Sequence, residues 1–331
     1  MKKIRIEDVA KQAGVSSATV SRALNQKDLV NPQTYAKIME AMNSLGYKPA
    51  ENVARFASMT TSRLIIVDIP TYANPFYRDI IAGIENIANK NNYKILINSM
   101  GFDNMLSICS EMRIAGVITL SGYSAAQLDK LVDLCPIVQC CEYCKGYPLP
   151  YVSVDDYKAT KNALHYLLTT GKKKFAIINL SSDYKFVIER GRAFNDFLYE
   201  NSLEINDDFN ISVPYFDYSL LIPAVKVVLS KEDRPDAIFA VSDVFATAAV
   251  KVALELNIKI PEELAIIGFD NLPLSDIITP NITSVKQPRF TMASMACEFL
   301  LEKIRKPEIA NKQYLLETKL IIRETTLKKE N

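Results

Sequence analysis

The sequence predicts a small all-α head followed by two α/β lobes, each built on a doubly wound parallel sheet. Residues 7–46 contain three short amphipathic patterns with helical spacing. From Leu64 onward, short apolar runs alternate with helical patterns, the order typical of parallel strands joined by crossover helices. A chain of 331 residues is long enough for two or three such compact units.

The composition is that of a soluble globular protein, with 49% hydrophobic and 23% charged residues. No apolar run approaches the roughly 20 residues needed to span a bilayer. The first residues, "MKKIRIEDVAKQ", lack the apolar stretch of a signal peptide. We therefore expect a cytoplasmic protein with no membrane partner.

Few residue types in the chain are suited to metal binding or catalysis. Cys141 and Cys144 have the spacing of a metal or redox half-site, but no second cysteine pair stands at zinc-ligand spacing and His165 is the only histidine. The sequence has neither a Walker loop nor a GxGxxG motif. We expect no metal, no cofactor and no catalytic residues, although catalysis by paired carboxylates stays open.

Each predicted helix of the head carries one apolar stripe. The stripes are Val9, Ala10 and Ala13; Val20, Ala23 and Leu24; and Ile38, Met39, Met42 and Leu45. Gly14 separates the first two helices where the chain must turn sharply, and Ser16 can cap the second. Asn31 and Pro32 mark the start of the third helix, and Gly46 marks its end. Together the three stripes form one small core.

The other face of the second helix has a composition that suits DNA. It carries the small or hydrogen-bonding residues Ser17, Ala18, Ser21, Arg22 and Asn25, which allow a helix to approach bases and phosphates closely. Residues 1–60 hold nine basic and five acidic side chains, a net charge of +4, so the remainder carries −3. A basic head suggests a polyanionic partner.

The segments "IEDVAKQAGVSSATVSRALN" and "VNPQTYAKIMEAMNSLGYKP" resemble the helix-turn-helix head of the lac repressor (LacI/GalR) family of bacterial transcription regulators, nearly position for position. By that resemblance, Ser17, Ala18 and Arg22 would face base edges in the major groove, with Arg22 reading a guanine. The phosphates would be held by Ser16, Thr19, Ser21, Asn25 and Asn31. The alternative is a helical hairpin that only packs against the rest of the chain.

A polar connector, "AENVARFASMTTS", follows Pro49. In the family this segment is a hinge helix that folds on DNA and wedges an apolar side chain into the minor groove. The resemblance places Phe56 at the wedge position, although the Ala54-Arg55 pair comes one residue later than usual. A flexible linker without base contacts is the alternative. The expected domains are the head at 1–48, the hinge at 49–61 and an effector-binding and dimerisation part at 62–331.

The rest of the chain reads as two lobes. The first sheet is expected to contain "LIIVDI", "KILIN", "GVITL" and "PIVQC", and the second "FAIINL", "DAIFAVSD" and "LAIIGFDN". Helices are expected near 76–89, 157–170, 187–201, up to 256 and at 290–304, with crossovers between the lobes near 153–156 and 283–288. Such lobes bind ligands between them, at the carboxyl ends of their strands. The resemblance implies a periplasmic-binding-protein-like fold with an effector in this cleft.

Five residues at the strand ends are candidate effector ligands. By the resemblance, Arg190 occupies the family's effector-binding arginine position, and Phe76 and Phe216 match positions with an aromatic ring against the ligand. Asp243 ends "DAIFAVSD" and Asp270 ends "LAIIGFD". An arginine and two carboxylates can clamp vicinal hydroxyls, so a sugar or nucleoside is expected. Each residue could instead belong to the lobe core or to a salt bridge.

Two features bear on assembly. The segment "SMGFDNMLSICSEMRIA" is several residues shorter than in relatives, which predicts a clipped helix at 106–114 and leaves the dimer surface there open. The last residues, "LIIRETTLKKEN", lack the leucine repeat of tetrameric members. We therefore expect a homodimer.

The sequence as a whole favours an effector-controlled repressor that binds a pseudo-palindromic DNA operator and is not an enzyme. Two alternatives share the two-lobed fold. A solute-binding protein should have a signal peptide and no DNA-binding head. A sugar- or nucleoside-metabolising enzyme would show turnover.

Overall fold

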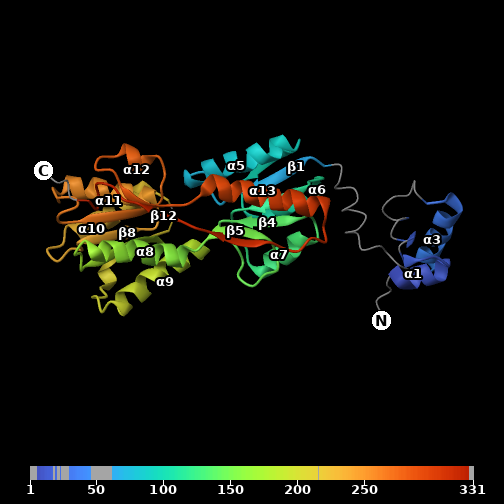
Figure 1. Ribbon diagram of the computed structural model, residues 1–331, viewed down its shortest axis with the longest axis horizontal. Helices are drawn as coiled ribbons and strands as arrows, with labels where there is room; N and C mark the ends of the chain where they lie inside the picture. Colours follow the sequence, from blue (N-terminus) through green and yellow to red (C-terminus); the bar gives the residue numbers. More distant parts are fainter. Residues whose placement is uncertain are drawn as a thin grey trace.

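The computed structural model describes residues 6–17, 19–20, 23, 30–45, 62–214 and 216–327. Helices α1 (Ile6–Ala13) and α3 (Pro32–Leu45) belong to the head, and all later elements form two lobes that lie end to end (Figure 1). In this described part of the chain, no helix is both long enough and apolar enough to cross a membrane.

The described residues of the head pack around one small core. It contains Val9, Ala10, Val20, Ala23, Ile38, Ala41 and Met42, with Ala13, Met39 and Leu45 packed against it. The predicted stripes are therefore confirmed, except for Leu24, which lies outside the described residues. Ser16 caps the second helix, because its Oγ accepts a hydrogen bond from the backbone N–H of Thr19 at 3.1 Å. Asn31 does the same for α3 through the N–H of Gln33, at 2.9 Å.

The first lobe is a six-stranded parallel sheet in the order β11-β5-β4-β3-β1-β2. Its strands are β1 (Leu64–Asp68), β2 (Lys94–Asn98), β3 (Gly116–Thr119), β4 (Ile137–Cys140), β5 (Tyr151–Val154) and β11 (Gln313–Leu316). Its helices are α5 (Phe76–Lys90), α6 (Phe102–Glu111), α7 (Ala125–Val132) and α13 (Arg289–Arg305). Side chains alternate between the faces: Ile65 and Val67 join the core that contains α5 and α13 side chains, whereas Ile66 joins that of α6 and α7.

The second lobe repeats this plan in the order β12-β10-β9-β8-β6-β7, with only β12 antiparallel to its neighbour β10. Its strands are β6 (Phe175–Leu180), β7 (Asn210–Val213), β8 (Ala237–Ala240), β9 (Ala265–Asp270), β10 (Thr283–Lys286) and β12 (Lys319–Ile321). Its helices are α8 (Asp156–Thr169), α9 (Lys185–Glu200), the 3₁₀ turn η2 (Asp207–Phe209), α10 (Tyr218–Leu229), α11 (Asp243–Glu255) and α12 (Leu274–Ile277). The predicted doubly wound α/β fold is confirmed.

The chain passes between the lobes three times. It crosses from β5 to α8, from β10 to α13, and again between β11 and β12, at residues 317–318. The third crossing was not anticipated from the sequence. The helix expected at 106–114 covers Phe102–Glu111 instead, because Gly101, with a φ of 82°, starts it earlier and the extended Met112 ends it.

The close approach of β9 to α11 gives a test of this packing. A Cβ atom on Gly268 would lie 2.2 Å from Oδ1 of Asp243, a carboxylate already held by the Ser284 hydroxyl and the Leu272 N–H. We expect Gly268→Ala to lower the free energy of unfolding by roughly 2–4 kcal/mol, because it overpacks a buried polar contact. Calorimetric unfolding measures this loss. Gly191→Ala, whose added atom would meet only the Asn179 side chain at 3.2 Å, is the control, and equal losses in both variants would contradict the prediction.

Candidate ligand-binding cleft and nucleic-acid interface

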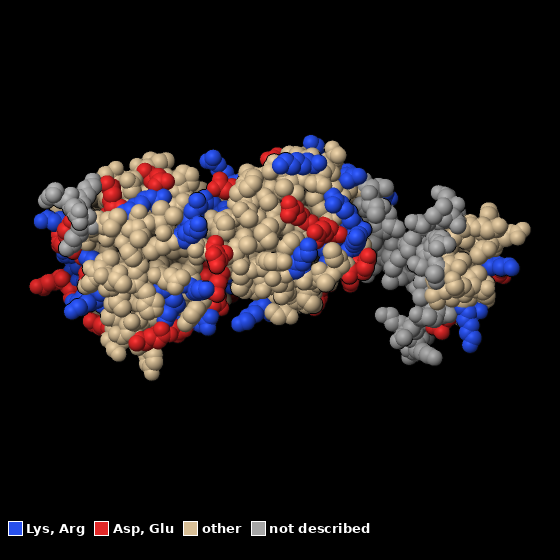
Figure 2. All heavy atoms as spheres, viewed as in Figure 1, with Lys and Arg blue, Asp and Glu red and all other residues tan. Residues whose placement is uncertain are grey.

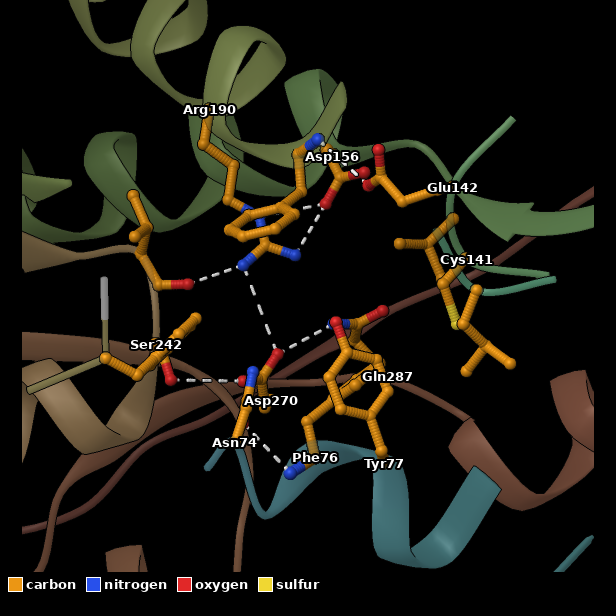
Figure 3. Close-up of a pocket in the computed structure, with 15 residues that line it drawn as sticks. Asn74, Phe76, Tyr77, Cys141, Glu142, Asp156, Arg190, Ser242, Asp270 and Gln287 are labelled. Carbon is orange, nitrogen blue, oxygen red and sulfur yellow. Dashed lines mark hydrogen bonds and ion pairs between the residues drawn. The ribbon is translucent and has the colours of Figure 1, made fainter. Parts of the chain in front are cut away.

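A cavity with an empty volume of about 450 Å³ lies between the lobes, where the carboxyl ends of the strands of both sheets meet. We call this space the inner cavity. Figure 3 shows that its residues come from both lobes and point toward one another. The lining comprises Asn74, Phe76, Tyr77, Leu120, Cys141, Glu142, Val154, Asp156, Phe186, Arg190, Phe216, Val241, Ser242, Asp270 and Gln287.

Arg190, on α9, is the central cation of the inner cavity and is only 4% exposed. Its Nε and Nη2 atoms both donate to Oδ1 of Asp156, at 2.9 and 2.7 Å, and Nη1 donates to the carbonyl of Val241 at 2.5 Å. The guanidinium lies 3.4 Å from the centre of the Phe269 ring. These contacts fix the plane of the guanidinium, and Nη1 lies 4.0 Å from Oδ1 of Asp270 (Figure 3).

Asp156 is the first residue of α8, immediately after the chain enters the second lobe. Burial alone would raise the pKa of Asp156, but the positive charges of Arg190 and Lys185 outweigh burial and hold this pKa below its usual value. Asp156 is therefore ionised at neutral pH and forms ion pairs with both cations.

Asp270 ends β9 with a φ of 102°, a left-handed conformation that is rare outside glycine. Its Oδ1 accepts from Nε2 of Gln287 at 2.8 Å, and its Oδ2 accepts from the hydroxyl of Ser242 at 3.3 Å. Burial raises the pKa of Asp270 to about 6, although the nearby positive charge of Arg190 acts to lower it. The backbone carbonyl of Asp270 accepts a further hydrogen bond from Arg289. The carboxylate is thus held in one position facing the cavity.

Glu142 follows β4 of the first lobe but binds the second lobe. Its two oxygens accept from the backbone N–H groups of Lys185, at 2.6 Å, and Phe186, at 3.2 Å, at the start of α9. The residue before this helix, Tyr184, provides no side-chain cap. The Glu142 carboxylate therefore caps a helix of the opposite lobe. Burial raises the pKa of Glu142 to about 7, despite the neighbouring Lys185 charge.

Of the five predicted effector ligands, Phe76, Arg190, Phe216 and Asp270 line the inner cavity. The lining does not include Asp243. Because β8 ends at residue 240, the backbone of Val241 and the side chain of Ser242 reach the cavity, and Asp243 becomes the first residue of α11.

The fully buried Asp243 carboxylate instead joins segments within the second lobe. It accepts from the N–H of Leu272 at 2.6 Å and from the hydroxyl of Ser284 at 2.5 Å. Burial and the charge of Asp270 raise the pKa of Asp243 well above its usual value. We correct the sequence-based expectation accordingly and assign Asp243 a structural role.

The polar cavity residues missed by the sequence analysis include Asn74, Glu142, Asp156 and Gln287. Asp156 and Gln287 lie in the two predicted crossover segments, so their position next to the cleft could have been recognised. Asn74 precedes α5, where its Oδ1 accepts from the N–H of Phe76 at 3.0 Å. No pattern in the sequence identifies Glu142, because its partners lie more than 40 residues away.

The predicted DNA-contacting residues lie partly within the described head. The side chains of Ser16 and Asn31 are exposed, and those of Ser17 and Thr19 are half-buried. Ala18, Ser21, Arg22, Asn25 and Phe56 lie outside the described residues.

Comparisons with known proteins agree with both parts of the chain. Residues 5–50 match the family described as bacterial regulatory proteins, lacI family, and residues 164–326 match the periplasmic binding protein-like domain. The HTH-type transcriptional repressor CytR of Escherichia coli strain K12 is 30% identical over 328 residues, which cover 97% of this chain and 96% of that protein.

Solved structures share the same architecture. The transcriptional regulator CelR in its cellobiose complex superposes with a TM-score of 0.72 at 25% identity, covering 97% of this chain and 99% of that one. The lac repressor dimer bound to operator and the anti-inducer ONPF has the same fold, with a TM-score of 0.72 at 21% identity, covering 99% and 100%.

A helix-turn-helix head joined to two lobes with a cavity between them defines a DNA-binding transcription regulator. The chain belongs to the lac repressor family of bacterial regulatory proteins.

The buried position of Glu142 predicts a pH-dependent stability. Because burial raises its pKa from 4.5 to about 7, its contribution to the free energy of unfolding is fully present below pH 4.5 and is lost as the pH rises through about 7. We expect Glu142→Gln to remove this loss, so that the variant gains on the order of 1–3 kcal/mol relative to the wild type between pH 4.5 and 8.

Calorimetric unfolding across this pH range measures the difference between the two proteins. Glu200→Gln, at the exposed end of the helix that Glu142 caps, is the control and should not show this gain. A constant difference between Glu142→Gln and the wild type would show that the Glu142 carboxyl does not titrate in this window.

Proposed function

We propose that this protein is a homodimeric repressor whose affinity for a pseudo-palindromic operator is controlled by a sugar or nucleoside in the inner cavity. The observation that carries the proposal is the rigid placement of Arg190 and Asp270 next to each other in the lining of this space. A fixed guanidinium and a fixed carboxylate offer donors and acceptors with the directionality that vicinal hydroxyls require. Phe76 and Phe216 add flat apolar surface for the carbon face of a sugar or a base.

The same hydrogen bonds support ligand binding over catalysis. Glu142, Asp156 and Asp270 are each held by donors of the protein itself. A glycosidase-type reaction needs two carboxyl groups that face the scissile bond and are available to the substrate. The protein therefore acts as a cytoplasmic ligand-controlled regulator and not as an enzyme. Among proteins of this fold, CelR was solved with cellobiose, and CytR is named a repressor.

For the DNA complex, we assign the head to 1–48, the hinge to 49–61 and the effector-binding and dimerisation part to 62–331. Base edges are contacted by Ser17, Ala18 and Arg22 in the major groove and by Phe56 in the minor groove. Phosphates are contacted by Ser16, Thr19, Ser21, Asn25 and Asn31. The match of residues 5–50 to the lacI family supports the contacts of the head, and the 30% identity to CytR over 97% of this chain supports the assignment of the remainder.

Replacing Asp270 by Asn tests the effector site while keeping the shape of the side chain. The amide loses a charged acceptor, so we expect about 10- to 100-fold weaker effector binding, equivalent to about 1.5–3 kcal/mol. Operator affinity without effector should change little. The effector is first identified by a thermal-shift screen of sugars and nucleosides, and the affinities are then measured by calorimetric titration. Asp233→Asn, at an exposed ion pair, is the control; wild-type affinity in Asp270→Asn would exclude this carboxylate from the site.

Arg22 and Asn25 should respond differently to substitution if the second head helix lies in the major groove. We expect Arg22→Ala to cost about 1–3 kcal/mol on the cognate operator and to relax the preference at one base pair per half-site. Asn25→Ala should weaken cognate and altered operators alike, because a phosphate contact carries no sequence information. Gel-shift titrations on a panel of operator half-sites measure both effects. An Arg22→Ala protein with unchanged sequence preference would refute the proposed groove geometry.

A further inference from the structure

Two consecutive cysteines stand at the end of β4, where the first lobe meets the inner cavity. Their sulfur atoms, Sγ of Cys140 and Sγ of Cys141, lie 3.8 Å apart. Cys140 is the last residue of β4 and is fully buried, whereas the half-buried Cys141 lines the inner cavity (Figure 3). The function proposed above uses neither thiol. The chain therefore holds two thiols in contact with each other, one of which faces the cleft.

The backbone at Cys141 brings the two thiols to the same side of the sheet. Successive side chains of a strand normally point to opposite faces. Cys141 interrupts this alternation with a φ of 69°, a left-handed conformation that is rare outside glycine. Its N–H donates to the carbonyl of Val152 at 2.9 Å, and its carbonyl accepts from the hydroxyl of Ser153 at 2.5 Å. The position of the pair is thus fixed by hydrogen bonds to β5.

The pair is a different site from the one that the sequence spacing suggested. Cys140 and Cys141 pack with side chains of α5 and α13, whereas Cys144 packs against the core of α6 and α7. In the part of the chain that the structure describes, no group of three or more His, Cys, Asp or Glu side chains could hold a metal ion. A structural zinc site needs four such ligands. The pair therefore offers two sulfur ligands and no zinc site.

The geometry of the pair suits a bridging atom better than a disulfide bond. The two residues are joined by a trans peptide bond, so their Cα atoms are about 3.8 Å apart, closer than the roughly 4.4–6.8 Å of ordinary disulfides. A direct S–S bond of about 2.05 Å would therefore be strained. An atom that bonds to each sulfur at about 2.3 Å, the length of metal–thiolate bonds, bridges a separation of 3.8 Å.

Charge limits which thiol-binding compounds this site accepts. Burial raises the pKa of the Cys141 thiol well above its usual value, and the neighbouring Cys140 and Glu142 act in the same direction. Soft metal cations bind the thiolate, which this environment disfavours. Three carboxylates and one guanidinium, which is already paired with Asp156, line the inner cavity, so an anionic reagent is disfavoured as well. An uncharged compound that reacts with neutral thiols meets neither obstacle. Trivalent arsenic hydroxides are such compounds.

A small molecule can reach the pair from the surface. Three aromatic residues of the inner cavity, Tyr77, Phe186 and Phe216, also line a second space at the mouth of the cleft. The lining of that space includes the exposed residues Ala73 and Pro214, so it opens to solvent. A compound that enters along these rings meets the Cys141 side of the inner cavity.

We propose that Cys140 and Cys141 form a dithiol site for uncharged trivalent arsenic compounds. In the reaction, two As–OH bonds break and two As–S bonds form, and each thiol proton leaves with a hydroxyl group as water. Arsenic stays trivalent, so no oxidant or reductant takes part. The third substituent of the arsenic lies in the inner cavity, next to Cys141. A compound bound at the pair therefore excludes the effector, a consequence that rests on the proposed function.

Phenylarsine oxide, which is uncharged and hydrated to a diol in water, tests the site on the full chain. Native mass spectrometry should show one adduct per chain, heavier than the protein by one phenylarsine oxide less one water. Digestion should place the adduct on the peptide that contains Cys140 and Cys141. An excess of 2-mercaptoethanol should leave it in place, because the second As–S bond is intramolecular, whereas 2,3-dimercaptopropanol should remove it.

Substitutions separate the pair from the other cysteines. Cys141→Ser and Cys140→Ala should each weaken phenylarsine oxide binding at least about 100-fold, because a single thiol loses the intramolecular second bond. Cys144→Ser is the matched control, since Cys144 is also half-buried and lies three residues beyond Cys141, and it should bind like the wild type. Thermal unfolding checks that the variants fold. The digestion of the wild-type adduct assigns the site without any substitution.

The effector identified by the thermal-shift screen tests the consequence for the cleft. At an effector concentration ten times its Kd, the apparent affinity for phenylarsine oxide should fall about tenfold, as expected for exclusive binding. Unchanged affinity would show that the arsenic compound does not occupy the effector site.

Three results would overturn the dithiol site itself: no adduct, an adduct on other cysteines, or equal affinity in Cys141→Ser and the wild type. These results leave the proposed function intact, because none of them involves a sugar or nucleoside. Conversely, a protein that binds no sugar or nucleoside refutes the proposed function and the exclusion of the effector with it, while the mass measurements still decide the site.

Discussion

The cleft depends on one buried ion pair, between Arg190 on α9 and Asp156 at the start of α8. Both side chains are at least 96% buried, so removing either partner would leave the other charge in the interior with fewer charged partners. The pair links α9 to the start of α8, where the chain enters the second lobe. The same guanidinium also donates to the carbonyl of Val241, immediately after β8. The same guanidinium also lies next to the carboxylate at the end of β9, since its Nη1 is 4.0 Å from Oδ1 of Asp270.

Two further contacts link the lobes across the cavity. Glu142 of the first lobe caps α9 of the second, and Arg289 at the start of α13 joins the Asp270 carbonyl to the Asp79 carboxylate on α5. Arg289 donates to Asp79 at 2.7 Å, so the backbone of Asp270, at the end of β9, is linked through Arg289 to a helix of the opposite lobe. The acidic and basic side chains on the outer face of both lobes are interspersed, without a large patch of one sign (Figure 2). Among the described residues, the ion pairs whose two side chains are both largely buried join Asp156 to Lys185 and Arg190, and Arg190 to Asp270, at the cleft.

The sequence predicted the alternation of strands and helices well, because buried parallel strands are short apolar runs that few other structures produce. The expectation that ligands bind at the carboxyl ends of the strands, together with the family resemblance, identified Arg190 and Asp270, which do face the cavity. The cavity lining does not include Asp243, because this residue lies three positions beyond the end of β8, where its side chain turns from the cleft into the lobe. Glu142 acts through contacts distant in sequence, which local patterns do not encode. Strands β11 and β12 were missed because they are short, and most of their side chains are exposed or half-buried.

The third crossing has a mechanical consequence. Three separate chain segments join the lobes, so a rotation about the line through them leaves all three nearly unstrained, whereas twisting or sliding would stretch at least one (Figure 1). The lobes thus have one easy degree of freedom. The last crossing also attaches an edge strand to each sheet, since β11 pairs with β5 and β12 pairs with β10 only a few residues apart. Cutting the backbone at residues 317–318 would therefore remove the third connection and leave β11 and β12 paired at the edges of their sheets, so that two segments would join the lobes instead of three.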